Sequence, residues 1–280
     1  MDALQVYLNG EYPELTEACV SVEDRGFLFA DGIYEVVRCY AGRFFELDRH
    51  LARLERSARE IRLGLPLSRD ELRRVAEELL RRTGLLDCSL YLQATRGVAP
   101  RNHAFPVGVT PTLFAMLQPA PSPDPALAER GGAAVTVPDE RWGRCDIKAV
   151  GLLPNILAKQ KAVEAGAQEA IFIRDGLVTE GSASNVFAVL DGVLWTHPQD
   201  RRILGGITRE VTLELAREQG VPVREEAITQ NMLWQSQELF CTGTVAEFLP
   251  VVRLDGQPVG DGRPGPVCRR LAAAFAARHG

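Results

Sequence analysis

One lysine of this chain stands apart from its other positive charges. The sequence holds 32 lysines and arginines, and only Lys148, Lys159 and Lys161 are lysines. A lysine amine can lose its proton in a desolvated site and attack a carbonyl carbon to form a Schiff base, which a guanidinium cannot do. Lys148 directly precedes the apolar run AVGLL, whereas the other two lie among the polar positions of LAKQKAVEAG. We therefore predict that Lys148 is a nucleophilic amine and that Lys159 and Lys161 are solvated charges.

A Schiff-base cofactor such as pyridoxal phosphate also needs a cradle for its phosphate, and two glycine turns are candidates. GGITRE at 205–210 puts two glycines before a helix, where the N–H groups of Ile207 and Thr208 would face an anion. CTGTVAE at 241–247 is a second Gly/Thr turn after an apolar strand. Glycine pairs also occur in ordinary turns, so neither segment is specific by itself.

Two further needs of such a cofactor and its substrate also have candidates. A protonated pyridine ring withdraws electrons most strongly, so a carboxylate should face its nitrogen. Glu180, in the Gly/Ser turn of VTEGSASNVF, is that carboxylate, although a solvated loop acid is the ordinary interpretation. RGVAPRNHAFP supplies Arg101 and His103, whose i, i+2 spacing in an extended loop would aim both side chains at a substrate carboxylate.

We expect two domains of the α+β class to position these residues. A chain of 280 residues is long enough for two domains at roughly 100 to 200 residues each. The proline-rich PAPSPDP marks the break, which predicts a domain at 1–118, a linker at 119–125 and a domain at 126–280. Asp-Gly turns at 175–176 and 191–192 join neighbouring strands directly, which favours α+β over a doubly wound parallel sheet.

Local signals place the first hairpin and the helices. Asn9-Gly10 in VYLNGEY predicts a type I′ hairpin. Apolar residues at helical spacing predict a helix that begins at Asp48 and is capped by that residue. Ser68 and Glu71 form a capping box that starts a second helix. The later helices are expected at 153–165, 206–219 and 266–278.

Composition argues against several classes of protein. The net charge of −5 gives no reason to expect nucleic acid or an anionic membrane as a partner. No apolar run approaches the roughly 20 residues of a membrane helix, and MDALQVYLNGEY lacks the pattern of a signal peptide. We therefore expect a cytoplasmic protein. The six cysteines form no CxxC and no Cys/His cluster, so they predict buried free thiols rather than disulfides or a metal site.

Taken together, these segments resemble the fold type IV pyridoxal-phosphate enzymes and, within them, the D-amino acid aminotransferases. The resemblance covers nearly the whole chain and implies a smaller N-terminal α/β domain, a larger C-terminal domain that binds pyridoxal 5′-phosphate, and a homodimer with its active site at the subunit interface. It rests on eight blocks in the order of the family: RGFLFADGIYEVV, HLARL, TRGVAPRNHAFP, RWGRCDIKAVGLL, AKQKAVEAGAQEAI, VTEGSASNVF, ILGGITRE and LFCTGTVAE.

The resemblance implies a role for each cofactor-binding position. Lys148 would carry the cofactor as an internal aldimine and, once released, would move the proton between Cα and C4′. Glu180 would face the pyridine nitrogen, and Arg141 would be a supporting contact. The phosphate would be bound by a set of guanidinium, backbone and turn groups: Arg53 of HLARL, Ile207, Thr208, Gly243 and Thr244.

The resemblance also implies how the substrate is held. Tyr34 in DGIYE would help bind the substrate carboxylate, with Arg101 and His103 reaching in from the neighbouring subunit. Where the D-amino acid enzymes tend to carry serines, this chain has Ala183 and Gly243, so a hydroxyl contact would be missing at each. Backbone N–H groups can still bind the phosphate, so we expect cofactor binding to survive.

The expected activity is a ping-pong transamination between a D-amino acid such as D-alanine and a 2-oxo acid such as 2-oxoglutarate. A branched-chain L-amino acid aminotransferase and an aminodeoxychorismate lyase of the same fold are alternatives, and the pair Arg101 and His103 favours D-amino acids over the branched-chain enzyme. A non-catalytic phosphate-ligand binder would have no use for that pair. A cofactor-free Schiff-base aldolase would leave Glu180 and the GGIT turn unexplained.

Overall fold

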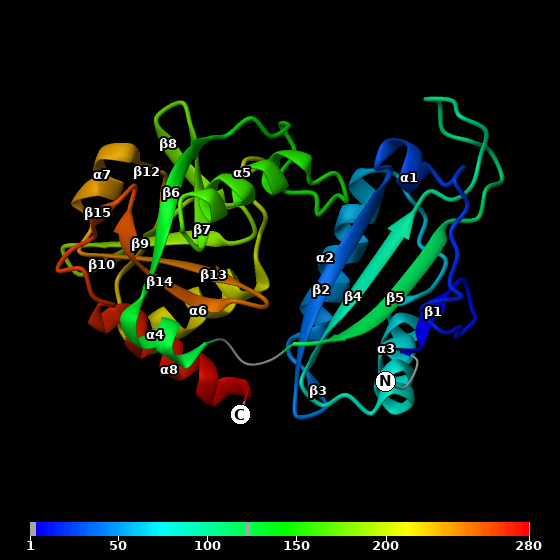
Figure 1. Cartoon of the computed structure of the whole chain (residues 1–280), viewed down its shortest axis with the longest axis horizontal. Helices are drawn as coiled ribbons and strands as arrows, with labels where there is room; N and C mark the ends of the chain where they lie inside the picture. Colours follow the sequence, from blue (N-terminus) through cyan, green and yellow to red (C-terminus); the bar gives the residue numbers. More distant parts are fainter. Residues whose placement is uncertain (1–3, 121–123, 280) are drawn as a thin grey trace. The chain divides into compact units, whose positions relative to one another are not determined.

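The chain forms two compact units, and the computed structural model describes residues 4–120 and 124–279 (Figure 1). One unit comprises Met1–Ser122 with Ile147–Gly151, and the other comprises Pro123–Asp146 with Leu152–Gly280. Part of the expected linker, residues 121–123, lies outside the described residues. Because the segment that carries Lys148 packs with the first unit, a single cut in the sequence does not describe the division.

The first unit is an antiparallel sheet covered on one face by two helices. The strand order is β1-β5-β4-β2-β3. Alternate residues of the central strands, such as Ile33 and Leu90, are fully buried against Leu51 and Leu79 of the two helices. The elements are β1 (Val6–Leu8), α1 (Arg25–Phe29), β2 (Gly32–Tyr40), β3 (Arg43–Phe44), α2 (Leu47–Glu60), α3 (Arg69–Thr83), β4 (Cys88–Thr95) and β5 (Thr112–Pro119).

Most local signals of the first unit are confirmed, and one is corrected. Asn9-Gly10 forms the hairpin turn with φ values of 50° and 102°. The capping box at Ser68 is present at the start of α3. Asp48, however, is not the cap of α2, because the helix begins one residue earlier at Leu47 and its N-cap is Glu46, which makes no side-chain cap bond. Leu47 is buried in the core, so packing rather than capping sets this helix start.

The second unit is built on a larger mixed sheet with the strand order β11-β10-β9-β13-β14-β6-β7-β8-β12, and β15 pairs with β14. Three pairs of neighbours are parallel, namely β10 with β11, β14 with β6, and β6 with β7. The strands are β6 (Gly132–Pro138), β7 (Glu169–Arg174), β8 (Leu177–Gly181), β9 (Asn185–Leu190), β10 (Val193–Thr196), β11 (Val223–Glu225), β12 (Ile228–Thr229), β13 (Glu238–Gly243), β14 (Glu247–Leu254) and β15 (Gln257–Pro258).

The helices of the second unit cover this sheet, and three of them agree with the predicted ranges to within about one residue. Ala158 and Ala162 pack against the sheet residue Phe172, and Phe275 stacks edge-on against Phe248 at 5.6 Å. The Asp-Gly turn at 175–176 joins β7 to β8 with φ values of 54° and 75°, as predicted. The helices are α4 (Pro125–Arg130), α5 (Leu153–Glu164), α6 (Ile207–Glu218), α7 (Gln230–Gln235) and α8 (Pro266–His279).

The cysteines are free thiols, and five of them are buried as expected. Cys19 is exposed, which corrects the expectation for that residue. Throughout the described residues, we find no helix whose length and apolar character would let it cross a membrane.

Candidate active site

Lys148 lies on a short segment that extends the sheet of the first unit. Its carbonyl accepts a hydrogen bond from the N–H of Tyr34 at 3.0 Å, and Val150 donates to the carbonyl of Gly32 at 3.1 Å. Its own N–H donates to Ser57 Oγ of α2 at 3.3 Å. The lysine is therefore held through its main chain by both β2 and α2.

The amine of Lys148 lies over an aromatic ring. Its Nζ is 4.2 Å from the centroid of the Tyr34 ring, and that ring stacks on Tyr91 with centroids 5.7 Å apart. Burial raises the pKa of Tyr91 to about 12. A ring face attracts a cation, so Tyr34 keeps the amine beside the sheet. The structure thus brings together two residues that we predicted separately.

Arg53, predicted to bind phosphate, is held by a buried carboxylate. Glu35 Oε1 accepts from Arg53 Nε at 2.7 Å, and Oε2 accepts from Arg53 Nη2 at 2.8 Å and contacts His50 Nδ1 at 2.8 Å. Burial opposes ionisation of Glu35, but the guanidinium keeps its pKa far below the usual range. Burial lowers the pKa of His50. The guanidinium is therefore fixed in one orientation.

Our sequence reasoning missed Glu35 and His50. The available signals were an acid inside the apolar strand GIYEVV and a histidine one helical turn before Arg53. A buried acid needs a partner of opposite charge, and the partner follows in the next helix.

Glu180, predicted to face a ring nitrogen, is a buried carboxylate of the second unit with three donors. Its Oε1 accepts from Arg141 Nη1 at 2.5 Å, and its Oε2 accepts from Asn185 Nδ2 at 3.1 Å and from the N–H of Leu204 at 3.0 Å. Burial raises the pKa of Glu180 to about 7, against the opposing effect of Arg141. This buried, hydrogen-bonded carboxyl is therefore not a solvated loop acid.

Arg141 is itself fixed by a second acid. Asp139 accepts from its Nε and Nη2 at 2.9 Å each, and the guanidinium lies 4.3 Å from the centroid of the Phe172 ring. The supporting role suggested for Arg141 thus has a geometric basis, since Asp139 holds the guanidinium on Glu180. Asp139 and Asn185 carry no signal in the sequence that distinguishes them from ordinary polar residues.

The start of α6 has the features expected of a phosphate cradle. Gly206 is its N-cap and has no side chain that could accept from the first N–H groups of the helix. These N–H groups also lack acceptors within the helix. A Cβ on Gly206 would lie 2.1 Å from Asn185 Oδ1, so the close approach needs a glycine. Thr242 lies directly opposite Asn185 in the sheet, and its buried Oγ1 has no partner among the described residues. A hydroxyl can donate a hydrogen bond to a phosphate oxygen, so a phosphate bound at this turn would give the Thr242 hydroxyl an acceptor.

The two positions that depart from the serines of the D-amino acid enzymes lie against each other. A Cβ on Gly243, at the end of β13, would lie 3.2 Å from the carbonyl oxygen of Ala183. Thr244 follows in the turn between β13 and β14. The glycine lets this turn pack closely on the backbone after β8.

Arg101 and His103 lie in the exposed loop between β4 and β5 of the first unit. Both pack on Phe29 of α1, with the Arg101 guanidinium 5.2 Å and the His103 ring 5.5 Å from its ring centroid. The i, i+2 pair therefore shares one side of the loop. Lys148, Tyr34, Arg53 and this pair belong to the first unit, whereas Glu180 and the two turns predicted to bind phosphate belong to the second unit.

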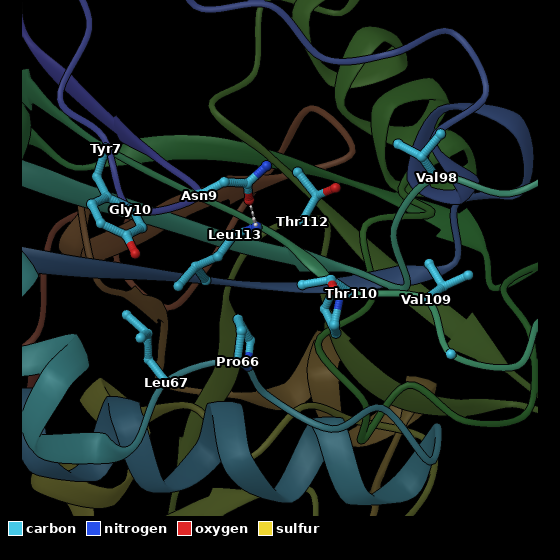
Figure 2. Close-up of a pocket in the computed structure, with 12 residues that line it drawn as sticks. Tyr7, Asn9, Gly10, Pro66, Leu67, Val98, Val109, Thr110, Thr112 and Leu113 are labelled. Carbon is cyan, nitrogen blue, oxygen red and sulfur yellow. Dashed lines mark hydrogen bonds between the residues drawn. The ribbon is translucent and has the colours of Figure 1, made fainter.

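A cavity of about 610 Å³ in the first unit lies apart from these residues (Figure 2). It is lined by the β1 hairpin around Tyr7 and Asn9, by Pro66 and Leu67, and by the chain from Gly108 to Leu113. Asn9 Oδ1 accepts from the N–H of Leu113 at 2.8 Å, as Figure 2 shows. Its lining holds the phenol of Tyr7, the amide of Asn9, two threonine hydroxyls and apolar groups, with no carboxylate, amine, imidazole or thiol among the lining residues.

Comparison with known proteins shows the family of this chain. The model of the family described as amino-transferase class IV matches residues 32–254. The chain belongs to the amino-transferase class IV family. This confirms the resemblance to the fold type IV enzymes, and the mixed helices and sheets in two units confirm the expected α+β class.

Relatives within the family are similar along almost the entire chain. The D-alanine aminotransferase of Bacillus licheniformis is 46% identical over 272 residues, which cover 97% of this chain and 96% of the relative. The D-alanine aminotransferase of Staphylococcus haemolyticus is also 46% identical over the same shares. The crystal structure of the Escherichia coli branched-chain amino acid aminotransferase superposes with a TM-score of 0.92 at 31% identity, covering 99% of this chain and 94% of that one.

Proposed function

We infer that this protein is a pyridoxal-phosphate-dependent aminotransferase that passes the amino group of a D-amino acid, such as D-alanine, to a 2-oxo acid, such as 2-oxoglutarate. The observation that carries this conclusion is the 46% identity, over 97% of the chain, to D-alanine aminotransferases. Branched-chain enzymes of known structure that resemble this chain are 27% to 31% identical, and we regard them as relatives in fold.

The cofactor explains why the lysine must be an amine. Pyridoxal phosphate supplies an aldehyde that can bond to an amine, and a ring that draws electrons from the Cα of that amine. Lys148 would hold the cofactor between turnovers through Nζ. When a substrate amine takes its place, the freed Nζ would be the base that moves the Cα proton. Its main-chain bonds to Tyr34 and Ser57 support this role, because they fix the backbone from which the amine extends.

Two groups of the second unit fit the other ends of the cofactor. Glu180 would accept the N–H of the pyridine ring, and the donors on both its oxygens leave it one orientation. The N–H groups of Ile207 and Thr208 would bind the phosphate with the turn at Gly243 and Thr244. The unpartnered hydroxyl of Thr242 supports the fit of an anion there.

In the first unit, Arg53 would be a further hydrogen-bond donor to the phosphate. Glu35 orients the Arg53 guanidinium, which would keep this group in the same position during each turnover. Tyr34, Arg101 and His103 would bind the substrate carboxylate. If the substrate carboxylate is held at one place and Lys148 approaches the substrate from one side, only one enantiomer has its Cα hydrogen directed toward the base.

We also propose a homodimer in which Arg101 and His103 of one subunit serve the site of the other. Their exposure supports this, because a substrate clamp with no cover in its own unit is complete only when something packs over it. The cytoplasm is the proposed location, where the buried free thiols would remain reduced.

The test is an amino-donor assay on the purified protein with 2-oxoglutarate as acceptor. D-Alanine should give pyruvate with ping-pong kinetics, and L-leucine should give little product. Activity on L-leucine alone would overturn the D-specific proposal in favour of a branched-chain enzyme. Release of pyruvate from aminodeoxychorismate without an amine acceptor would instead indicate the lyase.

A second measurement addresses the cofactor and the lysine. The purified protein should be yellow, and borohydride reduction should attach the cofactor irreversibly to the peptide that contains Lys148. Attachment to the peptide with Lys159 or Lys161, both exposed on α5, would refute the assignment.

A further inference from the structure

The substrate-binding loop of the first unit is held by the segment just before β2. This loop, residues 96–111, carries Arg101 and His103 and joins β4 to β5. The segment contains Asp24 and Arg25, the N-cap and first residue of α1. Both side chains are almost completely buried, with exposed fractions of 1% and 3%, which is unusual for charged residues beside an exposed loop.

Asp24 ties the two stems of the loop together. Its Oδ2 accepts from Thr95 Oγ1 at 2.9 Å and from Thr112 Oγ1 at 2.7 Å. Thr95 is the last residue of β4 and Thr112 the first of β5, and they lie opposite each other in the sheet. Its Oδ1 accepts the N–H of Gly26 at 2.7 Å, so the same carboxylate also starts α1.

Arg25 holds the part of the loop that surrounds His103. Its Nη1 donates to the carbonyl of Asn102 at 2.5 Å and to that of Ala104 at 3.4 Å, and its Nη2 donates to the carbonyl of His103 at 3.4 Å. One guanidinium therefore fixes three consecutive peptide units. Its planar fork can do this because its donors lie on three separate nitrogens, whereas an ammonium group presents all three of its donors from a single nitrogen.

Asp31 holds Arg25 in place and links it to the loop stem. It accepts from Arg25 Nε at 2.8 Å and from both Nε and Nη2 of Arg96, at 2.8 and 2.9 Å. Burial opposes its ionisation, but the hydrogen bonds and charges of Arg96 and Arg25 lower its pKa below the ordinary value. Arg96 also donates to the carbonyls of Ile61 and Arg62, which fastens the network to the end of α2.

Phe29 completes the arrangement from the same short helix. Its ring lies 4.8 Å from the Arg25 guanidinium, 5.2 Å from that of Arg101, and 5.5 Å from the ring of His103. The two predicted clamp side chains and the buried arginine therefore share one aromatic surface. The backbone of the clamp is set by Arg25, and its side chains rest on Phe29.

We propose that Arg25, supported by Asp24 and Asp31, is a positioning residue for substrate recognition: it holds the loop so that Arg101 and His103 meet the substrate carboxylate. The proposal rests on the function proposed above, since it concerns the same clamp. It also gives a role to the segment DRGFLFADG, of which that function uses no residue. A mobile loop would have to be ordered at each binding event, and Arg25 removes that cost in advance.

The test compares reactions that use the clamp with one that does not. In the holoenzyme, Arg25→Met should raise the KM for D-alanine by about 10- to 100-fold, the effect of a small misplacement of a binding group, with a smaller change in kcat. Hydroxylamine, which has no carboxylate, should react with the bound cofactor at a rate within about twofold of wild type, because this reaction bypasses the clamp. Arg82→Met is the control for loss of an arginine over an aromatic ring in the same unit, since Arg82 lies over the Tyr12 ring and donates to Glu78 and Gln5.

Each result separates the possible explanations. An unchanged KM for D-alanine in Arg25→Met would overturn the proposal, and so would an equal loss of the hydroxylamine reaction, which would indicate general damage. A wild-type enzyme without D-alanine activity would instead overturn the proposed function. The double variant that combines Arg25→Met with Arg101→Met should raise the KM for D-alanine by less than the product of the two single fold-changes, because both residues act through one contact.

Arg25→Lys provides the test if the methionine variant does not fold. It keeps the positive charge beside Asp31 but has only three donors on one nitrogen, fewer than the four hydrogen bonds that Arg25 makes to Asp31 and the loop carbonyls. Its KM for D-alanine should lie between those of wild type and Arg101→Met, and its melting temperature should remain near that of wild type. A wild-type KM in this folded variant would also overturn the proposal.

Discussion

Replacing Glu35 with glutamine should destabilise the first unit specifically. Its carboxylate is fully buried and receives two hydrogen bonds from Arg53 and one contact from His50, all between 2.7 and 2.8 Å. Glu35→Gln keeps the volume but places an amide donor against groups that donate, and it leaves the Arg53 charge uncompensated. Breaking a buried ion pair lowers the free energy of unfolding by about 3 to 5 kcal/mol, and because the glutamine keeps one oxygen, we expect a loss of about 3 kcal/mol.

The expected size of the change follows from the size of the first unit, Met1–Ser122 with Ile147–Gly151. A loss of about 3 kcal/mol corresponds to a fall in melting temperature of about 6 to 12 °C at about 150 to 250 residues and of about 12 to 24 °C at about 60 to 100 residues, and this unit lies between the two sizes. Glu46→Gln is the matched control, since Glu46 makes a half-exposed ion pair with Arg49. Such a pair contributes about 1 kcal/mol or less, so its loss should lower the melting temperature by about a third as much at most.

The aromatic residues of the chain allow each unit to be followed separately. All five tyrosines lie in the first unit, and all three tryptophans lie in the second. Thermal unfolding followed by tyrosine absorbance should therefore report the loss in Glu35→Gln, with a smaller shift in tryptophan fluorescence. A tyrosine midpoint that moves no more than that of the Glu46→Gln control would refute the argument that Glu35 holds Arg53.

Three further results are expected. Between pH 7 and 5 the stabilities of the two units of the cofactor-free protein should change in opposite directions. The pKa of His50 is lowered in the folded protein, so the unfolded chain binds a proton first, and the stability detected by tyrosine should fall below about pH 6.5. The pKa of Glu180 is raised to about 7, so the folded protein binds the proton first, and the stability detected by tryptophan should rise as the pH falls toward about 4.5. Changes of the same sign in the two signals would contradict this. Gly206→Ala should weaken cofactor binding in a fluorescence titration by about tenfold or more, because its Cβ would lie 2.1 Å from a fixed asparagine oxygen, whereas Gly205→Ala meets only the end of a flexible glutamine at 2.6 Å and should have a smaller effect. Lys148→Arg should fold but lose turnover with D-alanine by roughly 10²- to 10⁴-fold or more, since an arginine stays protonated, and single-turnover kinetics would detect any retained chemistry.

Local chemistry in the sequence was sufficient to predict many features of this protein. The capping box at Ser68 and the Asp-Gly turns depend only on residues a few positions apart, so their geometry follows from the residues themselves. The single lysine before an apolar run indicated amine chemistry for the same reason. The order of eight blocks along the chain then predicted the family, which the comparisons confirm.

Partners that lie far apart in the sequence were decided only by the tertiary structure. The sequence marks Lys148 as unusual, but only the sheet shows that its segment leaves the second half of the chain and pairs with β2. The same holds for Glu35 beneath Arg53 and for Arg25 beneath the loop of Arg101, since a buried charge is stable only where the fold brings its partner. Asp48 shows the limit of local signals, because burial of Leu47 in the core moved the helix start that capping chemistry had predicted. Residue type determined what these groups can do, and long-range packing determined where they do it.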